Sequence, residues 1–290
     1  MNAKDYHTNT DHAKEYFSVS QWKSFTKCES MAVAELDGTF KRRQTDALTM
    51  GNLFDTALLT PGLMPSFLAD HPEMVSTRGE SKGDLKSAFK AIADMAMACR
   101  SRNNFDSEYW LEGDKQVVLT GEIAGHKWRG MLDVCNTDNP RIIDVKTTRD
   151  FKPLWDERIK AKVPFYEYWG YWLQAAIYKA LYKQTFGFDA PFYIVAFSKE
   201  YVPQVRIFEM GNAQRLFSEI SNIENKTEVI SAIKSGGVEP GTCGLCDYCK
   251  KVVPVEVEIA ESYVDFTGEN IEAMMDVVFG GIDDERKDES

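Results

Sequence analysis

Residues 130–148 have the sequence GMLDVCNTDNPRIIDVKTT, and this stretch decides the fold that the chain is expected to adopt. It is rich in branched apolar residues and is divided by a polar segment with an Asn-Pro pair, which is typical of two strands joined by a turn. A turn centred on Asp138 and Asn139 would place Asp133 and Asp144 directly opposite each other. Because like charges that face each other across paired strands are destabilising, this pair calls for a compensating cation.

The second of these strands adds a lysine beside the carboxylates. Because side chains alternate along a strand, Asp144 and Lys146 share one face, while Ile143 and Val145 share the other. Oxygen ligands suit Mg²⁺ or Mn²⁺, which can polarise a phosphodiester, and a nearby ammonium stabilises developing charge. A D-x-K tripeptide alone is more often a solvated charged face, so the predicted metal site depends on the opposing Asp133 and on the apolar flanks.

Segments with helical or strand periodicity lie on both sides of this stretch. Helices, a series of strands, another helix and a further strand together indicate an α/β fold with a mixed central sheet flanked by helices. The predicted helices cover residues 18–36, 48–59, 81–100, 165–183 and 211–235. The predicted strands lie within residues 115–148 and 191–198.

Composition and charge predict three segments: a polar N-terminal arm over residues 1–17, one domain over 18–253 and an acidic tail over 254–290. The tail holds twelve acidic and two basic residues, so it supplies −10 of the net charge of −11 and leaves a nearly neutral remainder, in which a basic groove for nucleic acid is still possible. No apolar stretch approaches the roughly 18 residues of a membrane span, and the N-terminus lacks the apolar core of a signal peptide. We therefore expect a cytoplasmic protein without membrane contact.

Three of the six cysteines follow one another at three-residue intervals, at Cys243, Cys246 and Cys249. In a cytosolic chain of this length, clustered thiols bind metal more often than they form disulfides. Their spacing suits an iron–sulfur cluster or zinc, but the stretch contains no fourth cysteine. Cys99 and Cys135 are expected to be ordinary buried thiols.

The motifs GMLDV and IIDVKTT, followed by a helix with Gln174 and Tyr178, resemble the PD-(D/E)XK nuclease superfamily, particularly its RecB-like and phage RecE-like exonucleases. The resemblance covers about residues 18–251 and implies a restriction-endonuclease-like core. Gln174 and Tyr178 lie four residues apart and so share a helix face, as in the family's Q-x-x-x-Y motif. The motif implies DNA contact or support of the catalytic lysine, whereas a packed helix with two polar rim groups is the alternative. The catalytic residues implied are Asp133, Asp144, Lys146, Gln174 and Tyr178.

The resemblance also implies further metal ligands. In the family the helix before the sheet carries the pattern G-x-x-x-H-x-x-L, and residues 51–58 of this chain are GNLFDTAL. Asp55 thus stands where histidine is usual, and it is still a competent oxygen ligand for Mg²⁺ or Mn²⁺, although an acid on the helix surface is the alternative. Glu122 is a further candidate ligand, with Glu112 as the alternative to it.

The sequence around Cys28, SVSQWKSFTKCES, resembles the N-terminal helix of RecB-like nucleases. In those proteins one early cysteine and three late ones hold a [4Fe–4S] cluster. The resemblance therefore implies that Cys28 joins Cys243, Cys246 and Cys249 in such a cluster and clamps the first helix to the end of the nuclease core. Zinc, unligated thiols, and a fourth ligand from elsewhere are alternatives; the other candidate ligands are His126 and Asp247.

Residues 151–172 combine aromatic and basic side chains, which suits the binding of a frayed DNA end, although amphipathic packing explains many such stretches. The candidate DNA contacts are Lys152, Trp155, Arg158 and Tyr166.

The predicted function is a metal-dependent exonuclease that acts on duplex DNA ends and produces single-stranded DNA for phage-type recombination. The resemblance implies 5′ to 3′ polarity, a homo-oligomer, and a single-strand annealing recombinase as partner, in the bacterial host cytoplasm if a phage encodes the protein. One alternative is a single-strand-preferring iron–sulfur nuclease. Another is a DNA-end-binding module whose catalytic centre has decayed, which would bind ends without metal and without cleavage.

Overall fold

The computed structural model of the protein describes residues 5–6, 10–43, 45–252 and 254. The chain divides into two units, Met1–Val252 and Val253–Ser290, and every helix and strand below belongs to the first unit. Apart from Pro254, the predicted acidic tail over 254–290 lies outside the described residues. None of the helices in the described part of the chain has the length and apolarity to cross a bilayer.

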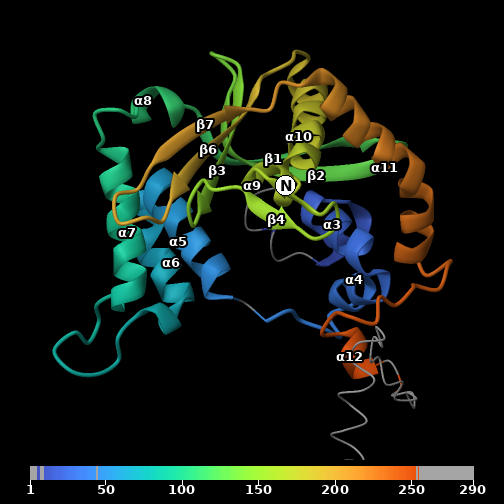
Figure 1. The fold of residues 1–290 in the computed structure, drawn as a ribbon, viewed down its shortest axis with the longest axis horizontal. Coiled ribbons are helices and arrows are strands. Elements are labelled where there is room, and N and C mark those ends of the chain that lie inside the picture. Colours follow the sequence, from blue (N-terminus) through green and yellow to red (C-terminus); the bar gives the residue numbers. More distant parts are fainter. Residues whose placement is uncertain (1–4, 7–9, 44, 253, 255–290) are drawn as a thin grey trace, which may run out of the picture. The chain divides into compact units, whose positions relative to one another are not determined.

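A five-stranded mixed sheet forms the centre of the first unit (Figure 1). The strands follow the order β1-β2-β3-β6-β7, in which β3 and β6 run parallel and the other neighbours run antiparallel. The sheet consists of β1 (Asp114–Ile123), β2 (His126–Asn136), β3 (Arg141–Thr148), β6 (Phe192–Ser198) and β7 (Val205–Glu209). The predicted α/β fold with a mixed central sheet is thereby confirmed.

Helices cover both faces of the sheet (Figure 1). One core holds apolar residues of α3, α10 and α11, and the other holds those of α5 and α7. The long helices are α3 (Val19–Lys27), α4 (Glu29–Leu36), α5 (Asp46–Leu59), α7 (Ser87–Arg100), α10 (Tyr171–Phe186) and α11 (Ala213–Lys234). The short elements are α2 (Thr10–Glu15), η1 (Pro61–Leu63), α6 (Met64–Asp70), η2 (Pro72–Met74), α8 (Ser107–Trp110), β4 (Leu154–Asp156), β5 (Ala161–Val163), α9 (Phe165–Tyr168) and α12 (Cys249–Val252).

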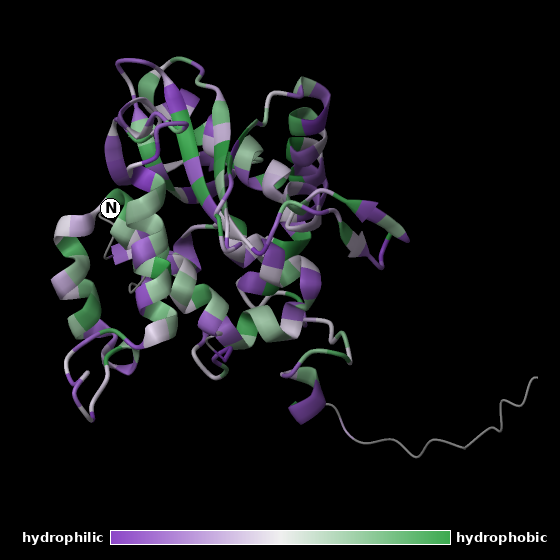
Figure 2. Ribbon diagram, turned by 60° about the vertical axis from the view of Figure 1, so that its left-hand side comes forward, coloured by the Kyte–Doolittle hydropathy of each residue, from purple (hydrophilic) through white to green (hydrophobic). Residues whose placement is uncertain are grey.

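The two cores follow from alternation along the buried strands. On β3, Ile142 enters the core beneath α10, whereas Ile143 and Val145 enter the core beneath α5 and α7. Figure 2 shows hydrophobic residues on the strands of the sheet and mixed apolar and polar residues on the helices. A strand that is buried on both faces needs apolar residues at nearly every position, which explains the apolar sequence FYIVAFS of β6.

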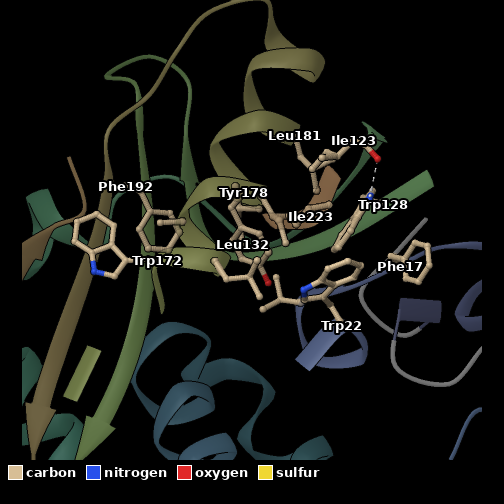
Figure 3. Close-up of a cluster of buried hydrophobic side chains, with 14 of the residues drawn as sticks. Phe17, Trp22, Ile123, Trp128, Leu132, Trp172, Tyr178, Leu181, Phe192 and Ile223 are labelled. Atoms are coloured by element: carbon tan, nitrogen blue, oxygen red, sulfur yellow. Dashed lines mark hydrogen bonds between the residues drawn. The ribbon is translucent and has the colours of Figure 1, made fainter. Parts of the chain in front are cut away.

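Aromatic residues anchor α3 to the sheet, as Figure 3 shows. The ring centroids of Trp22 on α3 and Trp128 on β2 lie 5.5 Å apart, and Phe17 packs against both. The indole N–H of Trp128 donates to the carbonyl of Ile123 at 3.2 Å, so its polar atom is satisfied inside the core. Replacing such a buried ring with alanine costs about 3–5 kcal/mol, so this contact contributes strongly to holding α3 on the sheet.

Two predicted helices are each divided into two. The helix predicted over residues 18–36 breaks at Cys28, whose extended backbone turns its sulfur toward other cysteines. The helix predicted over 165–183 breaks at Gly170, which adopts a left-handed conformation with φ of 63°. The helix predicted from residue 81 begins only at Ser87, because Gly83 forms a turn with φ of 95°. The short strands β4, β5 and β7 were not predicted.

Candidate active site and cysteine cluster

Asp144 lies at the centre of the predicted site and is only 2% exposed. Alternation on β3 directs its carboxylate toward α10, where Gln174 Nε2 donates to Oδ1 at 2.6 Å. Lys146 Nζ lies 2.7 Å from Oδ2 in an ion pair. Apart from this ammonium, Oδ2 has no hydrogen-bond partner among the described residues, and it is the oxygen best suited to bind a cation.

Asp133 reaches the same place from β2, by a geometry that the sequence did not predict. The register of the β2–β3 pair places Val134 opposite Ile143, and the paired residues end there, one position before Asp133 and Asp144. The carboxylate of Asp133 bends across the gap instead, and Oδ2 accepts a hydrogen bond from the backbone N–H of Val145 at 2.7 Å. The predicted register is correct, but the two aspartates are not a regular facing pair.

Strand β2 is distorted at Asp133. On its other side the pairing with β1 skips Gln116, which has a left-handed φ of 53°. Leu132 and Val134 should share a face of a regular strand, yet they enter opposite cores. The interruption frees the Asp133 side chain from the alternation and brings it to β3, in the manner of the local distortions that re-aim side chains next to active sites.

Charge repulsion indicates that three acids share this region. Burial raises the pKa of Asp133 to about 7, and the negative charge of Asp144 adds to the effect. Burial and the charge of Asp133 raise the pKa of Asp55 well above its usual value, so Asp55 on α5 faces the site. Burial would lower the pKa of Lys146, but the carboxylates of Asp144 and Asp133 outweigh it and raise that pKa.

Three carboxyl groups beside one ammonium repel one another when ionised, which is why the pKa values of Asp133 and Asp55 are raised, and a bound cation would relieve that repulsion. All of the candidate ligand atoms are oxygens, as Mg²⁺ and Mn²⁺ prefer. The three carboxylates are less tightly grouped than the four cysteines described below. Among the His, Cys, Asp and Glu side chains of the described residues, only those cysteines form a group of three or more whose ligand atoms all lie within 4.8 Å of one another. The donor chemistry and the unfilled Oδ2 of Asp144 fit a divalent cation.

Two residues at this site were missed in the sequence. The ring centroid of Tyr171 lies 5.4 Å from Lys146 Nζ and equally far from Lys23 Nζ on α3. Burial raises the pKa of Tyr171 to about 12, so it stays neutral. Its position three residues before Gln174 could have revealed it, because residues at that spacing share a helix face. Nothing local marks Lys23, which comes close to the site only through the packing of α3.

Tyr178 lies near the carboxylates, whereas Glu122 does not. Burial, followed by the charges of Tyr6, Asp144 and Asp133, raises the pKa of Tyr178 well above its usual value. Tyr178 is buried, and its ring fills the space above Gly130, where an added Cβ would meet Tyr178 Cε1 at 2.6 Å. Glu122 is exposed and pairs with Lys127, six residues along β2 from Asp133, which corresponds to about 20 Å of strand. The structure therefore does not bring Glu122 to the carboxylates. Its alternative, Glu112, is engaged instead by Arg141 in an ion pair of 3.0 Å.

The predicted DNA contacts lie in or next to the β4–β5 hairpin, which follows β3. Trp155 is 50% exposed and Lys152 is exposed, so both are accessible to a ligand. The guanidinium of Arg158 donates to both carboxylate oxygens of Asp156, at 2.9 and 2.6 Å, so its charge is compensated. Tyr166 is half-buried and packs against the core. Trp155 and Lys152 therefore keep the properties of DNA contacts better than Arg158 and Tyr166 do.

The four predicted cysteines come together although they are far apart in the sequence. All four Sγ atoms lie within 4.8 Å of one another, and the Sγ atoms of Cys28 and Cys249 are 3.5 Å apart. None of them forms a disulfide. Backbone N–H groups of Leu245 and Cys246 lower the pKa of Cys243 to about 6, whereas burial raises that of Cys28 to about 12. A metal would remove this disparity, because it binds cysteines as thiolates.

The other two cysteines, Cys99 and Cys135, are buried and lie outside this cluster, as expected.

Residues 18–252 match the model of the family described as PDDEXK-like domain of unknown function (DUF3799). The crystal structure named "Putative exonuclease", from Eubacterium rectale, is similar to this chain with a TM-score of 0.80 and 28% identity, over 97% of this chain and 98% of that one. The crystal structure of SSO0001 shares 13% identity over 78% of this chain and 94% of that one, and its TM-score of 0.32 is too low to carry an argument. No curated protein matches the chain.

Proposed function

Because the chain belongs to the family of PDDEXK-like domains of unknown function (DUF3799), we propose that it is a metal-dependent nuclease that removes nucleotides from DNA ends. The observation that carries the proposal is the buried carboxylate of Asp144, held by Gln174 and Lys146 beside Asp133 and Asp55. The similarity to the exonuclease-named structure from Eubacterium rectale supports action at ends.

The carboxylates that would hold Mg²⁺ or Mn²⁺ are those of Asp144, Asp133 and Asp55. The bound cation would polarise the scissile phosphate and lower the pKa of a bound water. Gln174 fixes the orientation of the Asp144 carboxylate, because its amide occupies Oδ1 and leaves Oδ2 toward the site. The N–H of Val145 does the same for Asp133 by occupying its Oδ2. This chain thus positions its ligands through contacts that do not depend on the substrate.

Lys146 has the properties of an electrostatic stabiliser. Against the effect of burial, the charges of Asp144 and Asp133 raise its pKa, which favours the protonated ammonium form. An ammonium fixed 2.7 Å from Asp144 Oδ2 lies beside the proposed ligands and can stabilise negative charge that develops on a phosphate there.

For the cysteine cluster we propose a structural metal that clamps α3 to the end of the domain. A single zinc with Zn–S bonds of about 2.3 Å places tetrahedral sulfurs about 3.8 Å apart, close to the 3.5 and 3.9 Å found between Cys249 and two other cysteines. A [4Fe–4S] cluster, which is also held by four cysteine thiolates, is the alternative that this set of residues allows. Metal analysis of purified protein, together with visible absorbance, distinguishes the two.

The test of the proposed function is digestion of linear duplex and single-stranded DNA labelled separately at the 5′ and 3′ ends. Reactions with Mg²⁺, with Mn²⁺ and with chelator compare the wild type, Asp144→Asn and the control Glu122→Gln. We expect loss of end label, resistance of closed circular DNA, and a rate loss of about a thousandfold or more in Asp144→Asn alone. The label lost first tests the predicted 5′ to 3′ direction. Metal-independent binding without any cleavage would contradict the proposal and favour a DNA-end-binding module.

A further inference from the structure

Lys23 is a half-buried cation near the active site that the proposed reaction does not use. Its Nζ donates to the backbone carbonyl of Trp169 at 2.8 Å. The acids with the largest influence on it, Asp144 and Glu219, act from a distance, and Lys23 takes part in no ion pair within the described residues. Lys23 is thus held by a carbonyl and an aromatic ring with no carboxylate in contact among the described residues, so its ammonium can still donate to an anion.

The position of Lys23 relates it directly to the reaction centre. Both Lys23 Nζ and Lys146 Nζ lie 5.4 Å from the centroid of the Tyr171 ring, so the two ammonium groups are no more than twice that distance, about 11 Å, apart. Burial, followed by repulsion from Lys146, lowers the pKa of Lys23 to about 8. Of these two cations, only Lys146 has a carboxylate in contact.

We propose that Lys23 binds a backbone phosphate of the nucleic-acid strand, within about three nucleotides of the phosphate that is hydrolysed. The limit follows from the rise of about 3.4 Å per nucleotide of one strand, set against the separation of Lys23 from Lys146. This inference rests on the proposed nuclease function. It adds the path of the bound strand, which would run from the active-site carboxylates along α3.

The surface beyond Lys23 supports the same path. Lys27 lies four residues farther along α3 and so shares the helix face of Lys23. It lines a cavity of about 550 Å³ together with Arg43 and two cysteines of the cluster. Arg42 also lines this cavity, but its guanidinium is bound to Glu35. Lys23 and Lys27 on one face of α3, with Arg43 in the same cavity as Lys27, supply positive charge that suits a phosphate backbone, although Asp247 also lines the cavity.

The test measures the affinity of short single-stranded and duplex oligonucleotides at increasing salt, in an Asp144→Asn background that prevents cleavage. Replacing Lys23 by glutamine should weaken binding about tenfold and reduce the slope of log K against log salt by about 0.7 on single strands. Lys23→Arg keeps the charge and should restore both quantities. Lys90→Gln removes an exposed lysine on α7 that pairs with Asp94, and it should change neither.

In the active protein, Lys23→Gln should raise KM more than it lowers kcat, because the contact is made with bound substrate before and during the reaction. Equal affinity and equal salt slope for Lys23→Gln and its parent would overturn the inference, while end digestion by the wild type would leave the proposed function standing. A loss of affinity with unchanged slope in both Lys23 variants would assign Lys23 to structure and also overturn it. If the parent binds no nucleic acid and the wild type digests none, both proposals fail.

Discussion

Replacing Asp133 by asparagine should make the protein more stable at neutral pH although it removes a proposed metal ligand. The aspartate is buried beside Asp144, and its pKa of about 7 shows that its ionised form is disfavoured in the folded state. Asparagine has the same shape and retains an oxygen that can accept the hydrogen bond from Val145. The substitution therefore removes the charge without removing the contact.

The sign and size follow from the raised pKa of Asp133. An acid whose pKa is higher in the folded than in the unfolded state contributes stability below the unfolded value, near 4, and loses it as pH rises through the folded value, near 7. Between pH 5 and 8 the wild type should lose about 2–3 kcal/mol through this group. Because Asp133→Asn lacks this titration, its advantage over the wild type should grow by the same amount across that range.

The assay is thermal unfolding from pH 5 to 8.5 in chelator, with Glu122→Gln as the control for loss of an exposed acid on the same sheet. For a domain of this size, the growing advantage of Asp133→Asn corresponds to roughly 4–12 °C in Tm. Mg²⁺ should raise the Tm of the wild type and have little effect on the variant. A difference in Tm between variant and wild type that stays constant across this pH range would refute the reasoning.

Three other substitutions test the supporting structure. Gln174→Leu leaves Asp144 Oδ1 without its donor, and the rate of DNA digestion should fall about 10–100-fold in the end-label assay. Cys28→Ser removes a link between segments that lie 221 residues apart in the sequence. The free energy of unfolding measured with denaturant should fall by up to about 5 kcal/mol, and metal analysis should show a loss of bound metal, whereas Cys99→Ala should show neither change. Gly130→Ala places a Cβ 2.6 Å from the Tyr178 ring and should lower the free energy of unfolding by about 1–3 kcal/mol in the same assay.

The sequence was sufficient for the parts of the site that depend on local periodicity. Asp144 and Lys146 share a face of β3, and the register of the hairpin is the one that the polar turn predicts. The displacement of Asp133 could not be predicted, because period-two alternation assumes an undistorted strand. The pairing of β2 with β1 is interrupted at Asp133, where Gln116 of β1 takes a left-handed conformation. Glu122 was a candidate acidic ligand with Glu112 as the alternative, but its position along the strand pair places it about 20 Å away from Asp133.

Contacts between distant segments were the other gap. Lys23 and Lys146 are brought to one aromatic ring by the packing of α3 against the sheet, and no pattern within either segment marks the meeting. The strands β4, β5 and β7 were missed because they are short and half exposed, so they lack the nearly continuous apolar pattern of β6. The cysteines were an exception, since thiol spacing and family resemblance indicated a contact across more than 200 residues, and the four sulfurs do meet.

The cysteine cluster and the active site are connected through one short helix. Cys28 ends α3, and Lys23 lies just over one turn before it, in contact with Trp169 and Tyr171 next to the start of α10. Because α10 also carries Gln174, a shift of α3 can change the position of the Asp144 carboxylate through the contact of Lys23 with Tyr171 and the hydrogen bond from Gln174 to Asp144. Loss of the metal should therefore weaken substrate binding before it unfolds the domain. A cluster-free protein that stays folded and keeps the salt slope of the intact protein would show that α3 is held in place by the core around Trp22 alone.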